Sequence, residues 1–451
     1  MRDCALRDMR VQAYASQRVN LLTSELFDPR TKEFLHNRTI VVNTSSGDIV
    51  EIRESEPDDQ IVDSIPVIDL RGKTVLPGLV DAHTHIFLHA YAETPSTNQE
   101  RDESTVERIL RASNHAKSAL LAGYTTYRDL GTEGIYNVDI GFRDAINRGI
   151  IPGPRMFVVS EAIASSGGYE TRIENNLPGI GTTTPRLSDP ADGPYGARAA
   201  VRRRIGAGAD VVKFYADYRK RSLRFPPQAW PGALPIRNPP SNNLLNSQRS
   251  PNIPLFTQEE MSAMVDEAKT SKAPIAAHAQ SSEGMIRAAK AGVTTIEHGL
   301  EGNDAALQAM KENGTIFVPT LSVMETALKG TKEFRTVLDF LFQAHKMGIK
   351  IAAGGDTGAF PHGENIREVE LLVKAGLSIE DALQAVTLRG WEACGGDLCG
   401  RMFGSLEVGA AADVVAFDGN LRQDLSSLRK VDFVMKDGKI YKKHGKPHNM
   451  V

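Results

Sequence analysis

VLPGLVDAHTH, residues 75–85, is an apolar run that ends in the histidine pair His83 and His85. Four later runs also end in side chains that can bind or complete a metal site. They are DVVKFY (210–215) with Lys213, APIAAH (273–278) with His278, TTIEH (294–298) with His298, and IKIAAGGD (349–356) with Asp356. In a closed barrel of parallel strands, the carboxyl ends of the strands meet on one face, where such enzymes build their active sites. The pattern therefore predicts a metal hydrolase.

Strand-like and helix-like segments alternate between residues 75 and 404. Helical periodicity covers 104–122, 282–291, 304–313 and 331–347, and each segment stops at a glycine, a usual helix terminator. Further strand signals lie at 125–130, 155–160 and 315–321. Eight strands alternating with helices predict an α/β fold, a (β/α)8 TIM barrel with parallel strands. An open doubly wound sheet is the competing fold, but it would not bring the ligand-bearing strand ends to one point.

Residues 17–74 and 405–447 show a different pattern. Apolar and polar residues alternate, as in half-buried antiparallel strands, in 38–43, 48–53, 412–417, 430–436 and 438–441. Asp437-Gly438 between the last two runs is a hairpin signal. Neither part has enough strands for a stable sheet of its own. We therefore predict one small β-sandwich domain made from both segments, beside a hydrolase barrel over 75–404.

The composition is that of a soluble globular protein, with 451 residues of which 41% are hydrophobic and 24% charged. A net charge of −3 without a Lys/Arg stripe argues against nucleic acid as a partner. No apolar run approaches the ~20 residues that span a bilayer, and the charged start lacks the apolar core of a signal peptide. We expect a cytoplasmic protein without a membrane partner, which acts on a small-molecule substrate and assembles as a homo-oligomer.

The histidines and the aspartate are predicted metal ligands. His83 and His85 lie two residues apart, so on a strand they share one face and can hold one ion. His278 and His298 end consecutive strands, although one such histidine alone would more often be a core residue. Asp356 follows AAGG, whose small residues let the backbone approach an ion closely. The alternative role of Asp356 is the N-cap of a helix that begins near residue 362.

Lys213 is the unusual member of the group. A lysine at the end of a buried strand must lose its charge, pair with a carboxylate, or be chemically altered. A structural ion pair is the common fate of such a lysine. Because an ammonium group cannot bind a cation, we favour chemical alteration beside four histidines.

These motifs resemble the amidohydrolase superfamily from about residue 75 to residue 436, in the branch of imidazolonepropionase-like proteins, Xaa-Pro dipeptidases and ochratoxin-hydrolysing amidases. The matching stretches are VLPGLVDAHTH, GYTTYRDLG, IPGPR, DVVK, AAHA, TIEHG, GGDT, HGxNxxE and LEVGAAADVVAF. The resemblance implies that Lys213 carries a carbamate bridging two divalent ions, for which zinc is expected. It also implies the ligands of each ion, which are His83, His85 and Asp356 for one and His278 and His298 for the other.

The implied site defines a mechanism. A hydroxide that bridges two Lewis-acidic ions is a nucleophile at neutral pH, because metal binding lowers the pKa of water to about 7. Asp356 would pass the proton of the hydroxide to the leaving nitrogen, as general base and then general acid. We predict a dinuclear metal-dependent amidohydrolase that cleaves an amide C–N bond in an N-acyl amino acid, a dipeptide-like compound or a cyclic amide. The alternatives are a ring-opening hydrolase or deaminase of a heterocycle, decarboxylation at the same metals, and an inactive binding homologue.

Tyr169 and Tyr215 are the predicted substrate contacts. Tyr215 lies two residues beyond Lys213 on the same strand face, where packing in the barrel mouth is the alternative. Tyr169 stands where dipeptidases of this branch usually have a histidine, and a phenol cannot become a cation near pH 7. This departure counts against a dipeptide substrate. The long connection 216–255 leaves the fourth strand above the predicted metals, and we expect it to cover the substrate.

Overall fold

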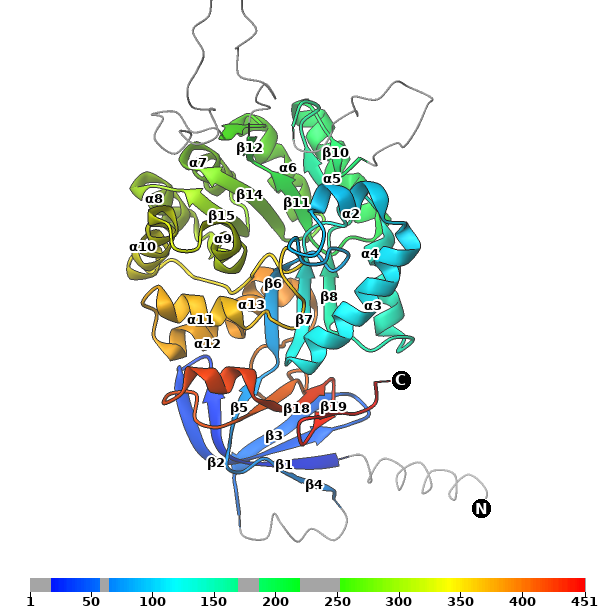
Figure 1. Cartoon of the computed structure of the whole chain (residues 1–451), viewed down its shortest axis with the longest axis vertical. Coiled ribbons are helices and arrows are strands. Elements are labelled where there is room, and N and C mark those ends of the chain that lie inside the picture. The colour runs from blue at the N-terminus through cyan, green and yellow to red at the C-terminus, as the bar shows by residue number, and fades with distance from the viewer. Residues whose placement is uncertain (1–17, 57–64, 169–185, 220–251, 451) are drawn as a thin grey trace, which may run out of the picture.

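The computed structural model describes residues 18–56, 65–168, 186–219 and 252–450. Figure 1 shows parallel strands surrounded by helices in the upper part, and below them a twisted sheet built from both ends of the chain. The α/β fold and the sheet shared by the two ends are thus present, as the sequence predicts.

Two parallel sheets form the centre of the upper part. The first pairs β6 (Leu79–Thr84), β7 (Tyr124–Asp129) and β8 (Arg155–Val158). The second has the order β10-β9-β11-β14-β15-β16, with the bounds Ser188–Pro190, Ala162–Ala164, Val212–Tyr215, Ile275–Ser281, Thr295–Glu301 and Ile316–Val318. Every residue of β6, β7 and β11 is buried. Burial of both faces is typical of parallel strands that helices cover.

Backbone hydrogen bonds connect these two sheets. The amides of Asp210 and Val211, just before β11, donate to Val158 O of β8 at 2.8 and 3.2 Å. Beyond β16, the segment predicted as the eighth strand, 349–354, forms only an isolated bridge between Phe317 and Ile351. The amide of Ala82 in β6 donates to Ala353 O at 2.9 Å. The segment before Asp356 therefore lies directly against β6.

Helices cover the outside of the parallel strands. Two agree residue for residue with the predicted ranges, α7 (Ser282–Ala291) and α8 (Asp304–Asn313), and both have a side-chain N-cap and a left-handed glycine at the C-cap. The others are α2 (Ser96–Asp102), α3 (Thr105–Leu121), α4 (Val138–Asn147), α5 (Gly193–Ala207), α6 (Gln258–Thr270), α9 (Leu321–Leu328), α10 (Lys332–Lys346), α11 (Arg367–Lys374), α12 (Ile379–Ala385) and α13 (Leu388–Cys394). The helices predicted at 104–122 and 331–347 are thus also present, as α3 and α10, with bounds that differ by one residue at each end. Short 3-10 turns lie at Gly396–Cys399 and Leu425–Arg429.

One sheet joins the two ends of the described chain. Its strands follow the order β20-β19-β18-β17-β5-β1-β2-β3, and β4 also pairs with β1. Their bounds are Arg18–Asp28 (β1), Glu33–Asn43 (β2), Asp48–Glu54 (β3), Val67–Asp69 (β4), Lys73–Pro77 (β5), Val414–Asp418 (β17), Val431–Lys436 (β18), Lys439–Lys443 (β19) and Lys446–Pro447 (β20). Asp437 and Gly438 form the predicted hairpin turn, both with positive φ. The sheet is hydrogen-bonded continuously along this order, and buried residues from both halves of the chain form one core on it.

The terminal sheet leads directly into the first parallel strand. β5 and β6 are separated only by Gly78, where a Cβ atom would lie 2.1 Å from Thr125 Oγ1. The amide of Gly78 donates to Asp413 O at 2.9 Å. The strand that carries His83 is therefore anchored at its base by the sheet that the chain ends complete.

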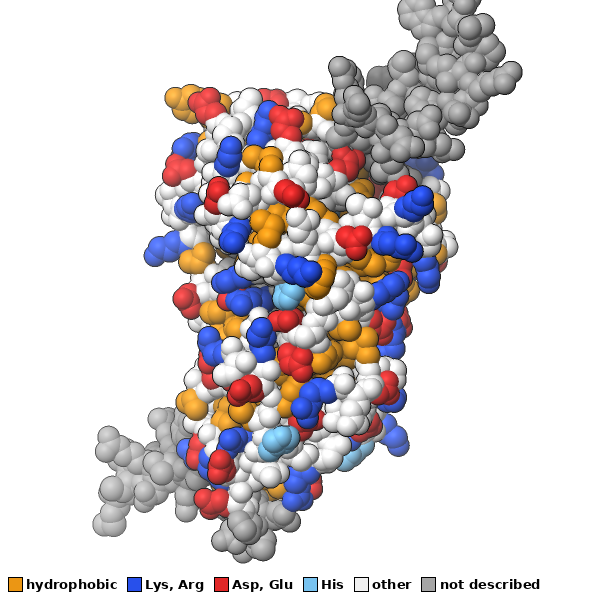
Figure 2. Space-filling model, turned by 90° about the vertical axis from the view of Figure 1, so that its left-hand side faces the viewer, with side chains coloured by type: hydrophobic (Ala, Val, Ile, Leu, Met, Phe, Trp, Pro, Cys, Tyr) orange, Lys and Arg blue, Asp and Glu red, His pale blue; other side chains and the backbone are white. Residues whose placement is uncertain are grey.

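The surface carries charges of both signs. Figure 2 shows Lys and Arg side chains interspersed with Asp and Glu side chains on the face that it displays. Among the described residues, no helix combines the length and the apolar character that crossing a membrane would require.

Candidate metal centre

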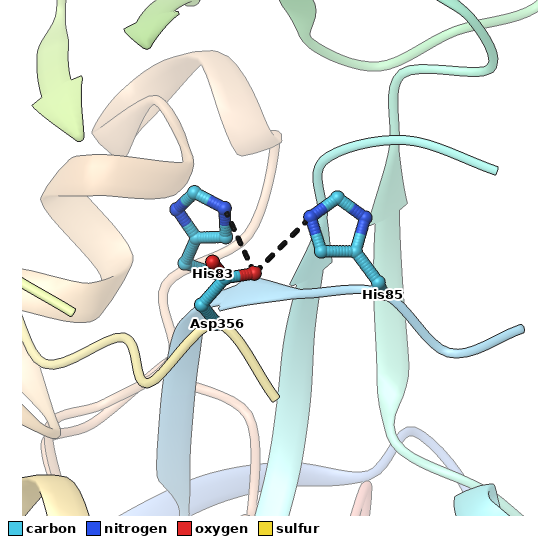
Figure 3. A group of neighbouring side chains, drawn as sticks. All are labelled: His83, His85 and Asp356. Carbon is cyan, nitrogen blue, oxygen red and sulfur yellow. Dashed lines mark ion pairs between the residues drawn. The ribbon is translucent and has the colours of Figure 1, made fainter. Parts of the chain in front are cut away.

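His83, His85 and Asp356 converge at the end of β6, as Figure 3 shows. One ligand atom from each lies within 4.8 Å of the others. Asp356 Oδ1 is 3.6 Å from Nε2 of His83 and 3.3 Å from Nε2 of His85. All three predicted residues thus direct a donor atom toward one point, a geometry that suits a divalent ion.

The second nitrogen of each of these histidines is held away from that point. Nδ1 of His83 is 2.8 Å from Oε2 of Glu297, and Nδ1 of His85 is 2.9 Å from the carbonyl oxygen of Gly131. An oxygen acceptor at Nδ1 places the ring proton there and leaves the lone pair of Nε2 free for a metal. Both rings are therefore held in the tautomer that binds a metal through Nε2.

Glu297 and Arg128 form a fully buried ion pair behind His83. The Oε1 atom of Glu297 is 2.9 Å from Arg128 Nη2, and both side chains are 0% exposed. Although burial alone would raise the pKa of Glu297, the charge of Arg128 and the hydrogen bond with His83 hold it well below its usual range. Our sequence analysis missed both residues. The available signal was the charged residues Glu297 and Arg128 inside the predicted strands 294–298 and 125–130.

His278 and His298 form a second histidine pair beside the first. Their ring centroids are 4.5 Å apart, and the ring of His298 is 4.9 Å from that of His83. Nδ1 of His298 lies 2.9 Å from Thr320 Oγ1. Nε2 of His278 is buried and has no hydrogen-bond partner among the described residues. An unpartnered buried nitrogen costs free energy unless it binds something, and a metal ion fits this donor.

Lys213 lies on β11, next to the strand of His278, with 2% of its surface exposed. Burial lowers its pKa to about 8, against the opposing effect of Glu297. Within the described part of the chain we find no hydrogen bond or ion pair of its ammonium group. The structural ion pair that was the alternative for this lysine is therefore absent among the described residues.

The charge states of His83 and His298 also suit metal binding, which requires neutral imidazole. Burial, followed by the nearby Lys213 charge, lowers the pKa of His83 to about 4. Burial and then His83 lower the pKa of His298 to about 3. For His85, burial lowers the pKa, but the hydrogen bond to Asp356 and the nearby carboxylate charges together outweigh it and raise the pKa to about 9. Because metal binding requires neutral imidazole, an ion bound at His85 would displace this proton.

Two of the predicted ligands have left-handed backbone conformations. φ is 77° at His298 and 61° at Asp356, values that L-residues rarely adopt. Such strain collects at functional sites, where the surrounding structure imposes it. Asp356 does not serve as a helix N-cap, because the next helix, α11, begins at Arg367 with Ile366 as its N-cap. Its carboxylate faces the histidines instead.

Aromatic side chains line the edge of the site. The ring of Tyr215 is 5.0 Å from that of His278, and the ring of Tyr218 is 5.3 Å from it. Tyr218 belongs to β12 (Asp217–Arg219), which pairs with β13 (Asn252–Pro254) at the base of the long connection. Sequence analysis did not single out Tyr218. Tyr169 and residues 220–251 of the connection lie outside the described residues, as do the contacts predicted for them.

A family model spans most of this chain. The model of the amidohydrolase family matches residues 74–441. The chain belongs to the amidohydrolase family. This amidohydrolase is 27% identical to ochratoxinase of Aspergillus niger, over 95% of this chain and 88% of that protein. It is also 24% identical to imidazolonepropionase of Geobacillus thermodenitrificans, over 93% of this chain and 94% of that one.

The fold of this amidohydrolase is similar to a crystal structure of a Xaa-Pro dipeptidase with bound methionine. The TM-score is 0.75 and the identity 30%, over 94% of this chain and 100% of the other. The predicted family and branch are confirmed. The protein is a hydrolase of C–N bonds other than those of ordinary polypeptides, in a family that generally uses divalent metal ions.

Proposed function

We propose that this amidohydrolase is a dinuclear enzyme, with one ion held by His83, His85 and Asp356 and the other by His278 and His298. The observation that carries the proposal is the convergence of the first three donors within 4.8 Å of one another. The buried, unpartnered Nε2 of His278 supports the second ion. Both sets come from strand ends on one face, which is where parallel barrels place their active sites.

We also propose that the upper part is a closed (β/α)8 barrel. The hydrogen bonds that the amides of Asp210 and Val211 donate to Val158 O support closure on one side. The bridge at Ile351 and the bond from Ala82 to Ala353 support it on the other. Closure brings the end of β6 beside the end of β15, as the distance of 4.9 Å between the rings of His83 and His298 requires.

Bound ions would supply Lewis acidity, which activates water and polarises the scissile carbonyl group. Asp356 moves the proton: its carboxylate takes one from the attacking water and delivers it to the leaving nitrogen. The position of Asp356 supports this role, because its side chain is 18% exposed, against 1% for His83 and 11% for His85. Of these three donors, the carboxylate of Asp356 is therefore the most accessible to a substrate.

Lys213 would complete the site as a carbamate. Carboxylation by CO2 requires a neutral amine, and burial has already lowered the pKa of Lys213 to about 8. The neutral amine attacks CO2 and releases a proton to solvent, so the product is an anion with two oxygen donors. The product suits a position next to two metal ions, where an ammonium group would be repelled.

The proposed substrate is a small molecule with an amide bond, either an N-acyl amino acid, a dipeptide-like compound or a cyclic amide. Similarity to ochratoxinase and to a Xaa-Pro dipeptidase supports this class. The aromatic faces of Tyr215 and Tyr218 beside His278 favour an apolar or planar group next to the scissile bond.

Metal content and substrate range test the proposal together. Elemental analysis of the purified protein should find close to two divalent ions per chain, with zinc expected. A panel of N-acyl amino acids, Xaa-Pro dipeptides and lactams should include a substrate whose hydrolysis stops on chelation and returns with two equivalents of metal. A folded protein that binds at most one ion would contradict the dinuclear site. A two-ion protein inactive on the whole panel would contradict the substrate class.

Lys213→Ala tests the carbamate and has a matched control. Lys436, on β18 of the terminal sheet, is also a buried lysine, but its Nζ atom donates to Gly153 O at 2.8 Å. Lys213→Ala should lose metal as well as rate, whereas Lys436→Ala should keep both ions per folded chain. Full metal content and activity in Lys213→Ala would remove this lysine from the site.

A further inference from the structure

The segment HGENIRE, residues 362–368, matches a family motif, but it provides none of the proposed ligands. Three of its polar residues, His362, Asn365 and Glu368, are nevertheless buried, with 9%, 0% and 1% of their surfaces exposed. Burying three such groups costs free energy unless each has partners. Those partners lead to both halves of the candidate site.

Asn365 leads to the half that contains His83 and Asp356. Its Nδ2 atom lies 2.6 Å from Asp81 Oδ2, 2.7 Å from the Tyr127 hydroxyl and 3.1 Å from Thr357 Oγ1. The other oxygen of Asp81 accepts the amide N–H of His83 at 3.0 Å and that of Gly355 at 3.3 Å. Asp81 thus holds the backbone of one ligand and of the residue preceding the other.

Thr357 closes this network on the far side of Asp356. Its hydroxyl donates to Asp81 Oδ2 at 2.8 Å, and its amide donates to His83 O at 3.2 Å. The residues on both sides of Asp356 are therefore tied to Asp81, and Asn365 orients Asp81. This arrangement accounts for the left-handed φ of 61° at Asp356, because the flanking residues are held in place.

Glu368 leads to the half that contains His298. Its Oε1 atom accepts the amide of Leu321 at 2.9 Å, and its Oε2 atom accepts the amide and hydroxyl of Ser322 at 2.7 and 2.8 Å. These residues form the first turn of α9. The residue before them, Thr320, has a φ of 50° and holds Nδ1 of His298 through its hydroxyl, at 2.9 Å. Glu368 therefore fixes the turn that orients His298.

We propose that residues 362–368 act as one positioning device with two separate arms, Asn365 for the His83–Asp356 half and Glu368 for the His298 half. The inference rests on the dinuclear site proposed above. Neither residue contacts the donor atoms, so both act through the residues that they hold. Outer partners of this kind typically change metal affinity by 10- to 100-fold.

Site-specific metal affinity tests the two arms. Zinc affinity is measured with a competing chelator on the full-length apo-proteins of wild type, Asn365→Leu and Glu368→Gln. The measurement is then repeated in a His298→Ala background, in which only the His83–Asp356 half of the site is intact. Asn365→Leu should weaken zinc binding by about 10- to 100-fold in both backgrounds. Glu368→Gln should weaken the second ion in wild type by a similar factor, but should change nothing in His298→Ala.

Glu325→Gln is the matched control for general destabilisation. Glu325 lies on α9 and binds Arg367 of the same segment at 2.8 Å, so its loss disturbs the same helix pair without touching Thr320 or Asp81. Its metal affinity should remain that of wild type. If Asn365→Leu does not fold, Thr357→Val removes a hydroxyl of the same network and should give the same selective loss.

Two results would overturn the inference. One is an equal loss of both ions in Asn365→Leu and Glu368→Gln. The other is a loss of zinc affinity that correlates with the fall in unfolding temperature across all the apo-proteins, including the control Glu325→Gln. If the wild-type protein binds two ions and hydrolyses an amide, either result would leave the proposed function intact. A wild type that binds one ion or none would instead contradict the proposed function itself.

Discussion

Glu297 lies between His83 and Arg128, 2.8 Å from Nδ1 of the histidine and 2.9 Å from Nη2 of the arginine. Arg128 in turn donates to the carbonyl oxygen of Ala82 at 2.6 Å, on the strand that carries His83. The carboxylate thus sets the tautomer of the histidine, while the guanidinium keeps that carboxylate ionised and fixes the backbone.

Glu297→Gln should weaken metal binding. The glutamine amide can donate to Nδ1 as well as accept from it, so the ring is no longer held in one tautomer. We expect zinc affinity to fall by about 10- to 100-fold, as for other outer-shell carboxylates. The variant should also lose about 3–5 kcal/mol of unfolding free energy, because Arg128 keeps a buried charge without its partner. Metal titration and urea unfolding measure the two effects.

A second buried ion pair provides the control. Glu161 pairs with Arg204 at 2.8 Å, and their side chains are 4% and 7% exposed. Glu161→Gln should lower stability with little change in zinc affinity. The tautomer argument would be wrong if Glu297→Gln bound zinc as tightly as wild type.

Asp356→Asn should separate metal binding from proton transfer. Asparagine keeps an oxygen near the two histidines but cannot take a proton. The variant should retain much of its metal, while kcat falls by roughly 10²–10⁴, the range for general acid–base groups. Steady-state kinetics on the metal-loaded variant give the answer, and near-normal turnover would refute the proton-transfer role.

Removing the metal should lower the unfolding temperature. Ions that bind only the folded state stabilise it by about 2.7 kcal/mol at a free concentration of 100 times Kd. The metal-free site also leaves Nε2 of His278 buried and unpartnered among the described residues. Calorimetry before and after chelation should show a fall in Tm that zinc reverses. An unchanged Tm would mean that the folded protein binds no metal tightly.

Tyr218→Ala should raise KM and leave the metal content unchanged. The ring of Tyr218 packs 5.8 Å from that of Tyr215 and 5.3 Å from that of His278, so it borders the site without supplying a ligand. Loss of an aromatic contact worth about 0.5–1.5 kcal/mol corresponds to a roughly 2- to 10-fold effect. Tyr195, 91% exposed on α5, provides the surface control. A wild-type KM in Tyr218→Ala would place the substrate elsewhere.

Local signals made much of the fold predictable. α7 and α8 have their predicted bounds, because a capping side chain begins each helix and a glycine ends it. The eighth strand was less predictable. The end of this segment approaches β6 so closely that a Cβ atom on Gly354 would lie 2.7 Å from the backbone nitrogen of His83. Such contacts depend on the tertiary structure and leave no periodicity in the sequence.

The convergence of His83, His85 and Asp356 could be predicted because it follows from one rule, that parallel strands end on one face. Glu297 and Asn365 could not, because their roles depend on partners far away in the chain. Glu297 is separated from His83 by 214 residues, and Asn365 from Asp81 by 284. A buried charge in an apolar run signals that a partner exists, but it does not say which one.

The position of β5 in the terminal sheet has a consequence for the synthesis of the protein. β5 pairs with β1 on one side and β17 on the other, and Lys73 meets Asp418 across 345 residues. At the usual rate of translation, the edge of β5 that pairs with β17 stays unpaired for on the order of tens of seconds. An apolar strand edge left open in this way invites pairing with other chains. A truncated protein that lacks β17 should therefore aggregate rather than fold into a smaller active enzyme.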